Sequence, residues 1–317
     1  MIQSLLQRDN IALTMSAILV SMGAFVMGLL SIQIPVSGGG RCLACPKKQP
    51  SKYAYEMFCL YYSPIWMTAM AIVVVFQLYE SFTAQTYNLF CGSLAIPLFL
   101  QPILFPGFMH SPDRSKPWYQ RFSFKANIWI AIYSFIGNYW YTHYFYSVLK
   151  ASYSMPATRL NNVPIAMFLA THAYFSSYHV FSNACLRYVK TSYKEGWIRT
   201  LLYVSVVLVL SYFTAFMETL SISAFPYYSF EDRYMAYTIG SAFYGIYFLV
   251  SFPAFVLFDD HIDDDDVKTS TVVTKNVTTH VVTLWETIVQ SCGYGMIILC
   301  LLDFVRLQTG IPLIVGA

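Results

Sequence analysis

The chain has 317 residues, of which 57% are hydrophobic, 18% are aromatic and 11% are charged. Soluble domains carry about 25% charged residues, so this composition excludes a soluble globular protein, and the abundant aromatic residues exclude a disordered one. The net charge is only +3 and the basic residues are scattered, so nucleic acid is not an expected partner. Length and composition predict an integral membrane protein that forms one bundle.

The predicted elements are membrane-spanning helices, each of which needs about 20 mostly apolar residues. The first apolar stretch is longer than the core of a signal peptide, so we expect an anchor helix. The third contains Pro97, Pro102 and Pro106 and is expected to be kinked or re-entrant. We therefore expect an all-α polytopic bundle of eight helices. The expected spans are 11–34, 61–80, 87–108, 126–149, 163–186, 200–222, 237–258 and 281–307.

The distribution of Lys and Arg predicts the orientation of this bundle. With eight spans, the loops on one side carry 14 basic residues and the other side carries 5. Basic residues favour the cytoplasmic side, so both termini are expected on the non-cytoplasmic side. The basic loops are 35–60, 109–125, 187–199 and 259–280.

Two parts of the chain are expected. Residues 1–50 form the anchor helix and a linker with a glycine run and a Cys-X-X-Cys pair. Residues 51–317 form a seven-helix membrane domain that includes the acidic loop 259–280. The seven cysteines are irregularly spaced, which indicates no disulfide framework.

Three loop motifs have a functional and a plain interpretation. Cys42 and Cys45 are half of a zinc ribbon or a redox pair, but no second pair follows them. The acidic run 259–266 contains a DDxxD pattern, which binds magnesium diphosphates in prenyl-transferring enzymes, but a second metal motif is missing. Asn276-Val277-Thr278 is a glycosylation sequon on the expected cytoplasmic side. We interpret all three as solvated loops.

Polar residues within the spans are the informative minority, because a charged group there costs about 2.5–3.5 kcal/mol. The polar face of span 126–149 consists of Asn127, Ser134, Asn138 and Thr142, with His143 beside it. The polar face of span 163–186 consists of His172, Ser176, His179 and Asn183. No two of the six histidines are three or four residues apart, so no metal site is expected.

Several of these groups are expected in one layer of the bilayer. At a rise of about 1.5 Å per residue, Glu218 lies roughly 6 Å, His143 roughly 9 Å and His172 roughly 14 Å inside the non-cytoplasmic end. Glu80 lies at that same end. A neutral buried carboxylic acid can donate a proton, and the many aromatic rings could stabilise a cation. This arrangement fits a lipid-handling isomerase and also a proton-coupled transporter.

Ordered sequence stretches carry a family resemblance. They include Lys125-Ala126-Asn127-Ile128-Trp129-Ile130, Gly137-Asn138-Tyr139, Thr142-His143-Tyr144-Phe145, Asn161-Asn162-Val163-Pro164 and Phe225-Pro226-Tyr227-Tyr228. Together they resemble the cycloeucalenol cycloisomerase, or cyclopropyl sterol isomerase, family. The resemblance extends from about residue 53 to 307, whereas residues 1–50 have no counterpart and the loop 259–280 diverges.

This resemblance implies opening of the 9β,19-cyclopropane ring of cycloeucalenol to give obtusifoliol in the endoplasmic reticulum membrane. It implies a cyclopropyl sterol and membrane lipid as partners and no redox cofactor; protein partners are not indicated. A proton must reach C19, a cation forms at C9 and a proton leaves C8. Such a reaction needs an acid, a base and a dry, electron-rich pocket.

The residues within the spans suggest hypotheses for each role. Glu218 is the expected acid and Glu80 its alternative. His172 is the expected base, with His143 or His179 as a proton relay. The expected substrate-binding residues are Asn138 and Asn183 for orientation, Tyr139, Trp140 and Tyr244 for the cation, and Asp232 or Arg233 for the sterol 3-hydroxyl.

Two other classes of function stay open at this point. A proton-coupled lipid transporter would move a sterol without changing its bonds, although no inverted repeat is evident in the sequence. A non-catalytic sterol-binding membrane protein would return the sterol unaltered.

Overall fold

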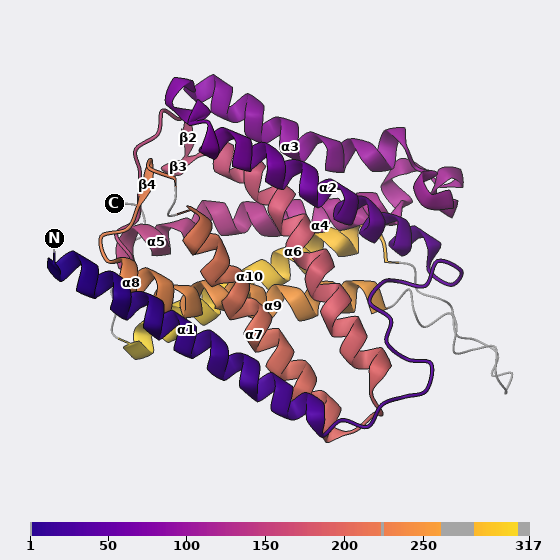
Figure 1. The fold of residues 1–317 in the computed structure, drawn as a ribbon. Coiled ribbons are helices and arrows are strands. Elements are labelled where there is room, and N and C mark those ends of the chain that lie inside the picture. Colours follow the sequence, from indigo (N-terminus) through magenta and orange to yellow (C-terminus); the bar gives the residue numbers. More distant parts are fainter. Residues whose placement is uncertain (1, 223–224, 261–281, 310–317) are drawn as a thin grey trace, which may run out of the picture.

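The fold is a bundle of long helices, as predicted (Figure 1). It is given by a computed structural model that describes residues 2–222, 225–260 and 282–309. Most of the acidic loop 259–280, including the DDxxD run and the sequon at Asn276, lies outside the described residues. The helices are α1 (Ile2–Ser31), α2 (Pro50–Val75), α3 (Ala84–Leu104), α4 (Phe122–Ile136), α5 (Thr142–Val148), α6 (Ile165–Ser192), α7 (Trp197–Ile222), α8 (Arg233–Met235), α9 (Ser241–Asp260) and α10 (Leu284–Thr309).

Two π-helical segments join helices into longer rods. Gly137–Tyr141 connects α4 to α5, and Ala236–Gly240 connects α8 to α9. The described residues therefore form eight long rods, which confirms the predicted all-α polytopic membrane bundle. α1 begins and α10 ends at the same end of the bundle, as an even number of crossings requires (Figure 1).

Six of these rods are long and apolar enough to cross a membrane by themselves. They are Ile11–Ser31, Pro50–Val75, Ala84–Leu104, Trp197–Ile222, Arg233–Phe258 and Leu284–Gln308. The other two rods, α4–α5 and α6, are more polar and lie inside the bundle. α6, for example, packs against α2, α3, α4, α7 and α9. Their polar side chains face protein, which is where polar groups in a membrane are tolerated.

The second and third helices differ from their predicted form. α2 begins at Pro50, well before the expected residue 61, because Lys52 and Glu56 are buried inside the helix and do not belong to a loop. α3 is one helix from Ala84 to Leu104, so the re-entrant alternative is wrong. Pro102 lacks an N–H, which frees the carbonyl of Leu98, and Asn127 of α4 donates its Nδ2 hydrogen to that oxygen at 2.9 Å.

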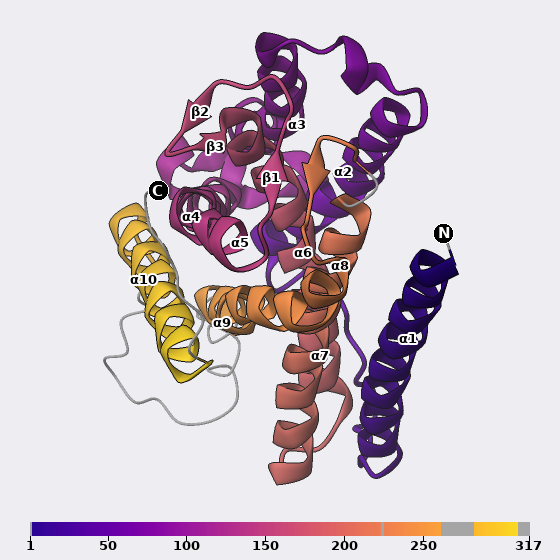
Figure 2. The same ribbon diagram turned by 90° about the vertical axis from the view of Figure 1, so that its left-hand side faces the viewer.

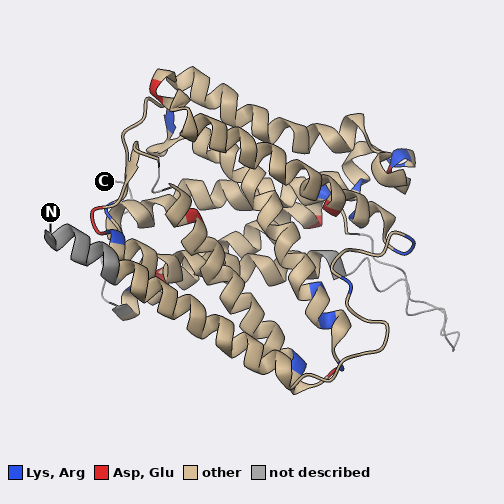
Figure 3. Ribbon diagram, viewed as in Figure 1, with Lys and Arg blue, Asp and Glu red and all other residues tan. Residues whose placement is uncertain are grey.

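The N-terminal helix lies on the outside of the bundle along α7 (Figure 2). Met15 of α1 packs with Phe216 and Tyr237. The linker that follows is tied to the end of α6, where the Val36 N–H donates to the Ser192 carbonyl at 2.7 Å. Most Lys and Arg residues gather at the end of the bundle opposite the beginning of α1, which is the asymmetry expected from the sequence (Figure 3).

Short β-structure covers the end of the bundle near α5 (Figure 1). β1 (Ser152–Tyr153) pairs antiparallel with β4 (Tyr228–Ser229). β2 (Arg159–Leu160) pairs with β3 (Val163–Pro164) through a turn in which Asn161 and Asn162 have φ of 48° and 60°. Two successive positive φ values define a type I′ hairpin, which asparagine tolerates well.

Candidate active site

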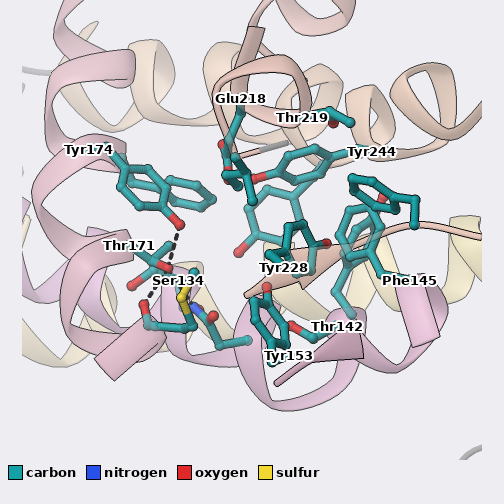
Figure 4. A pocket seen from close by; sticks show the side chains of 18 residues that line it. Ser134, Thr142, Phe145, Tyr153, Thr171, Tyr174, Glu218, Thr219, Tyr228 and Tyr244 are labelled. Atoms are coloured by element: carbon teal, nitrogen blue, oxygen red, sulfur yellow. Dashed lines mark hydrogen bonds between the residues drawn. The ribbon is translucent and has the colours of Figure 1, made fainter. Parts of the chain in front are cut away.

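A cavity of about 50 Å³ lies within the bundle, beneath the pair β1–β4 (Figure 4). Helices α4, α5, α6, α7 and α9 contribute its walls, and Tyr153 and Tyr228 of the β-pair contribute its cover. All lining residues belong to the described part of the chain. Among them Glu218 has the sole carboxyl group, and none is Lys, Arg or His.

Glu218 projects from α7 into this cavity and is 7% exposed. The hydroxyl of Tyr244, from α9, donates a hydrogen bond to Glu218 Oε2 at 2.8 Å. Tyr174, from α6, lines the same cavity. Aromatic rings surround this carboxyl group, and no cation lines its cavity. Such surroundings disfavour the charged form of a carboxyl group.

A line of hydrogen bonds continues from Tyr174 along the cavity wall (Figure 4). The Tyr174 hydroxyl lies 2.8 Å from Thr171 Oγ1. Asn138 donates from Nδ2 to Thr171 Oγ1 at 3.0 Å and to the Ser134 carbonyl at 2.9 Å. The line therefore connects α4, the π-helical segment and α6, and it ends at Tyr174, which lines the cavity together with Glu218.

Aromatic rings form much of the remaining wall. Tyr141, Phe145 and Tyr244 pack against one another with centroid separations of 5.2–5.7 Å. Phe175 and Tyr247 lie on another side, 5.4 Å apart. The faces of such rings are electron-rich, so this wall suits a positively charged intermediate.

The backbone of the first π-helical segment is fitted closely to this wall. A Cβ atom on Gly137 would lie 2.5 Å from the Tyr247 hydroxyl oxygen, so glycine is needed for the ring to approach. The widened turn also directs Asn138 and Tyr141 into the cavity. Single π-helical turns are frequent at functional sites.

Three of the sequence-predicted site residues line the cavity together, namely Glu218, Asn138 and Tyr244. Ser134 and Thr142, from the predicted polar face of the fourth span, line it with Asn138. Asn127, at the other end of that face, instead contacts α3 and His172. One end of the predicted face therefore belongs to the site and the other to helix packing.

His172 is buried outside the cavity lining. Its Nε2 lies 3.1 Å from Asn127 Oδ1, and its ring stacks on Phe99 at 4.2 Å. Asn127 donates its two Nδ2 hydrogens to backbone carbonyls, so its Oδ1 must accept and His172 carries its hydrogen on Nε2. Nδ1 of His172 has no partner among the described residues.

The other two candidate histidines are also held away from the cavity. His179 Nδ1 lies 2.7 Å from the Phe175 carbonyl, and rings that include Trp129 and Phe255 surround it. His143 Nε2 lies 2.9 Å from the Asn161 carbonyl, so His143 fixes the β2–β3 turn to α5.

The remaining candidates lie at several other positions. Glu80 is exposed in the short helix Leu78–Ser81, and Trp140 is 44% exposed. Asp232 is exposed and accepts a hydrogen bond from the Met235 N–H at the start of α8, and Arg233 is exposed beside it. Tyr139 stacks on Phe135, and Asn183 is buried in α6. None of these residues lines the cavity.

Several cavity residues were not predicted. On α6 the lining side chains are Met167, Thr171, Tyr174 and Phe175, a face adjacent to the predicted His172–Asn183 face. Tyr153, Tyr228 and Phe230 enter from the β-structure and its neighbour. In the described part of the chain, no group of three His, Cys, Asp or Glu residues is arranged to hold a metal ion.

Fold and cavity define the class: a multi-pass integral membrane protein whose buried, aromatic-lined site carries a single carboxyl group. The sequence is 42% identical over 219 residues to cycloeucalenol cycloisomerase of Arabidopsis thaliana. The aligned region covers 68% of this chain and 77% of that protein. The chain therefore belongs to the cycloeucalenol cycloisomerase family, as the sequence stretches predicted. No family model matches the chain, and no solved structure matches it.

Proposed function

We propose that this chain opens the 9β,19-cyclopropane ring of cycloeucalenol to give obtusifoliol by proton transfer inside the membrane. As a member of its family the chain is an isomerase. The observation that carries the finer proposal is the position of Glu218, the sole carboxyl group lining a buried aromatic cavity.

Glu218 is the proposed acid. Burial without a cation in the cavity lining keeps a carboxyl group in its neutral form, which can donate a proton. The proton is transferred to C19, and the electron pair of the C9–C19 bond forms the new C–H bond. C19 becomes a methyl group and C9 becomes cationic.

The aromatic wall is the proposed stabiliser of that cation. The rings of Tyr141, Phe145 and Tyr244 present electron-rich surface beside Glu218. Loss of a proton from C8 then forms the C8–C9 double bond and neutralises the charge. Atoms and electrons balance without an oxidant or reductant, so the reaction requires no redox cofactor.

His172 stays the predicted base, with His143 and His179 as predicted relays and Glu80 as the alternative acid. The free Nδ1 of His172 is chemically suited to accept a proton, but His172 does not line the cavity. A His172→Ala protein that folds and retains full turnover would remove this assignment.

The substrate must enlarge the cavity when it binds. A volume of about 50 Å³ is far smaller than a sterol skeleton. We propose that the cyclopropyl sterol enters from membrane lipid and displaces lining side chains. A multi-pass protein with a membrane-dissolved substrate fits the proposed location in the endoplasmic reticulum membrane.

The lining residues all lie between Ser134 and Tyr247, within the proposed catalytic part 51–317. Residues 1–50 then act as an anchor and linker packed on α6 and α7. Asp232 and Arg233 stay the predicted contacts for the sterol 3-hydroxyl, near the β-structure that covers the site.

The test is turnover in heavy water. The purified protein in lipid nanodiscs is incubated with cycloeucalenol in D₂O, and the sterol is analysed by mass spectrometry and NMR. Obtusifoliol with one deuterium in its C19 methyl group is expected. Unaltered sterol, with binding measured separately, would overturn the proposal and favour a sterol-binding protein, whereas flux across the membrane without a change in the sterol would favour a transporter.

A further inference from the structure

We infer that Thr171 and Asn138 are positioning residues that turn the Tyr174 hydroxyl hydrogen away from Glu218, so that the site accommodates a carboxylic acid and rejects a carboxylate. The inference rests on the proposed function for its activity readout, but the protonation of Glu218 can be measured independently.

The argument begins at the Thr171 hydroxyl, which has three polar neighbours and one hydrogen. Its oxygen lies 2.6 Å from the Met167 carbonyl, which can only accept. The single Thr171 hydrogen is therefore donated to Met167. The oxygen must accept from its other two neighbours, which are the Asn138 amide at 3.0 Å and the Tyr174 hydroxyl at 2.8 Å.

Asn138 fixes this arrangement because its amide cannot be reversed. Nδ2 donates one hydrogen to the Ser134 carbonyl and the other to Thr171. In the reversed amide, Oδ1 would face the Ser134 carbonyl oxygen, and two acceptors would oppose each other. Thr171 therefore always receives a hydrogen from Asn138, and its two lone pairs are fully used once Tyr174 also donates.

Tyr174 then has no hydrogen left for Glu218. Its hydroxyl hydrogen points to Thr171, so its oxygen presents only lone pairs to the cavity that it lines together with Glu218. Tyr244, on the other side, donates its hydrogen to Glu218 Oε2. Glu218 consequently faces one donor and one acceptor.

This polarity matches the carboxylic acid form of Glu218. A carboxylic acid accepts at its carbonyl oxygen and donates from its hydroxyl, so both contacts are satisfied. A carboxylate only accepts, so one of its oxygens would face the lone pairs of Tyr174. The different hydrogen-bonding of Tyr174 and Tyr244 therefore favours the protonated form of Glu218, as burial does.

The test combines infrared spectroscopy with kinetics in nanodiscs. The C=O band of a protonated Glu218 is assigned as the band that is lost in Glu218→Gln. Thr171→Val removes the acceptor for Tyr174 without changing side-chain volume, so Tyr174 becomes free to donate to Glu218. We expect the band at neutral pH to weaken, kcat to fall about tenfold and KM to stay unchanged. Thr171→Ser keeps the hydroxyl and is expected to restore both readouts.

Tyr174→Phe is the second variant, because it removes the hydroxyl and cannot donate. We expect it to keep the protonated band, shifted to higher frequency, although it alters a residue closer to Glu218 than Thr171 is. Thermal unfolding of each variant verifies that it folds.

The outcomes separate this inference from the proposed function. A wild-type protein without a Glu218 carboxylic acid band, or a folded Thr171→Val protein with a wild-type band and kcat, would overturn the inference. A band that weakens in Thr171→Val but persists in Tyr174→Phe supports it. If that pattern appears while Glu218→Gln retains full turnover, the inference stands and the catalytic role of Glu218 fails.

Discussion

Two buried glutamates at opposite ends of the bundle have contrasting surroundings. Glu56 in α2 is 1% exposed and forms a two-pronged ion pair with Arg187 of α6, with N–O distances of 2.6 and 3.0 Å. Its Oε2 also accepts the Ala44 N–H at 2.8 Å. Glu218 is almost as buried, but no basic residue lines its cavity, and its Oε2 accepts a hydrogen bond from the Tyr244 hydroxyl.

The partners of a buried carboxyl group, rather than its depth, therefore indicate its role. Glu56 accepts three hydrogens, two from the Arg187 guanidinium and one from the Ala44 N–H, and so ties two helices and the linker together. For Glu218 we propose the opposite: aromatic rings, and a Tyr174 hydroxyl whose hydrogen is donated to Thr171, favour the neutral form. Four predictions test this contrast.

The largest effect is expected for Glu218→Gln, which keeps the side-chain shape and removes the acid. Turnover should fall about 10²–10⁴-fold, the usual contribution of a positioned acid, while the free energy of unfolding changes by less than about 1 kcal/mol. The rate of obtusifoliol formation and thermal unfolding measure the two quantities. Glu195→Gln, at an exposed site outside the cavity lining, is the matched control and should turn over normally. Turnover of Glu218→Gln within tenfold of wild type would remove Glu218 as the donor.

Glu56→Gln should produce the opposite pattern. It removes the negative charge that pairs with the Arg187 guanidinium from α2, so the free energy of unfolding should fall by about 3–5 kcal/mol. Turnover per folded molecule should be nearly unchanged, because Glu56 lies far from the cavity lining. Replacing both partners by apolar residues, Glu56→Leu with Arg187→Met, should recover most of the stability. A double variant no more stable than Glu56→Gln would contradict the ion-pair explanation.

A smaller effect is expected for Tyr244→Phe, which removes the donor to Glu218 Oε2 but keeps the aromatic ring. One hydrogen bond in the site corresponds to a decrease in kcat of about three- to tenfold. If Tyr244 also faces the cation through its ring, Tyr244→Leu should lower kcat further than Tyr244→Phe. Equal rates for the two variants would argue that the ring contributes nothing.

The smallest effect concerns the linker beside Glu56. The backbone N–H groups of Lys47 and Lys48 lower the pKa of the Cys45 thiol below its ordinary value, and Arg41 adds to the effect. The thiolate is therefore populated at lower pH, so iodoacetamide should label Cys45 severalfold faster at pH 7 than an ordinary exposed thiol. Glu56→Gln weakens the ion pair that holds the linker beside Ala44 and is expected to change this labelling rate. Peptide mass spectrometry measures the labelling rate, with Cys45→Ser as control. The same rate in Glu56→Gln and in the wild type would show that Glu56 does not influence Cys45.

The helical architecture could be predicted because long apolar stretches have few other solutions in a membrane. The error at the start of α2 has a physical cause, since Lys52 and Glu56 resemble loop residues until their buried partners are known. The π-helical turns and the two β-pairs could not be predicted, because both depend on contacts between distant segments.

The site could be predicted in part. A lone carboxyl group near a helix end and the polar face around Asn138 are visible in the sequence, and both line the cavity. The rotation of α6 is not visible, because two adjacent faces of this helix carry polar residues. Packing with α3 assigns His172 to one face and leaves Thr171 and Tyr174 for the cavity.

The hydrogen bond from Asn127 to the Leu98 carbonyl has a consequence for how the protein is made. α3 inserted alone would carry into lipid a carbonyl that Pro102 leaves without a donor, at a cost of several kcal/mol. That cost is relieved only when α4 is beside it. The two helices are therefore expected to leave the insertion machinery as a pair. Asn127 then contributes to membrane insertion as well as to the packing of the finished bundle.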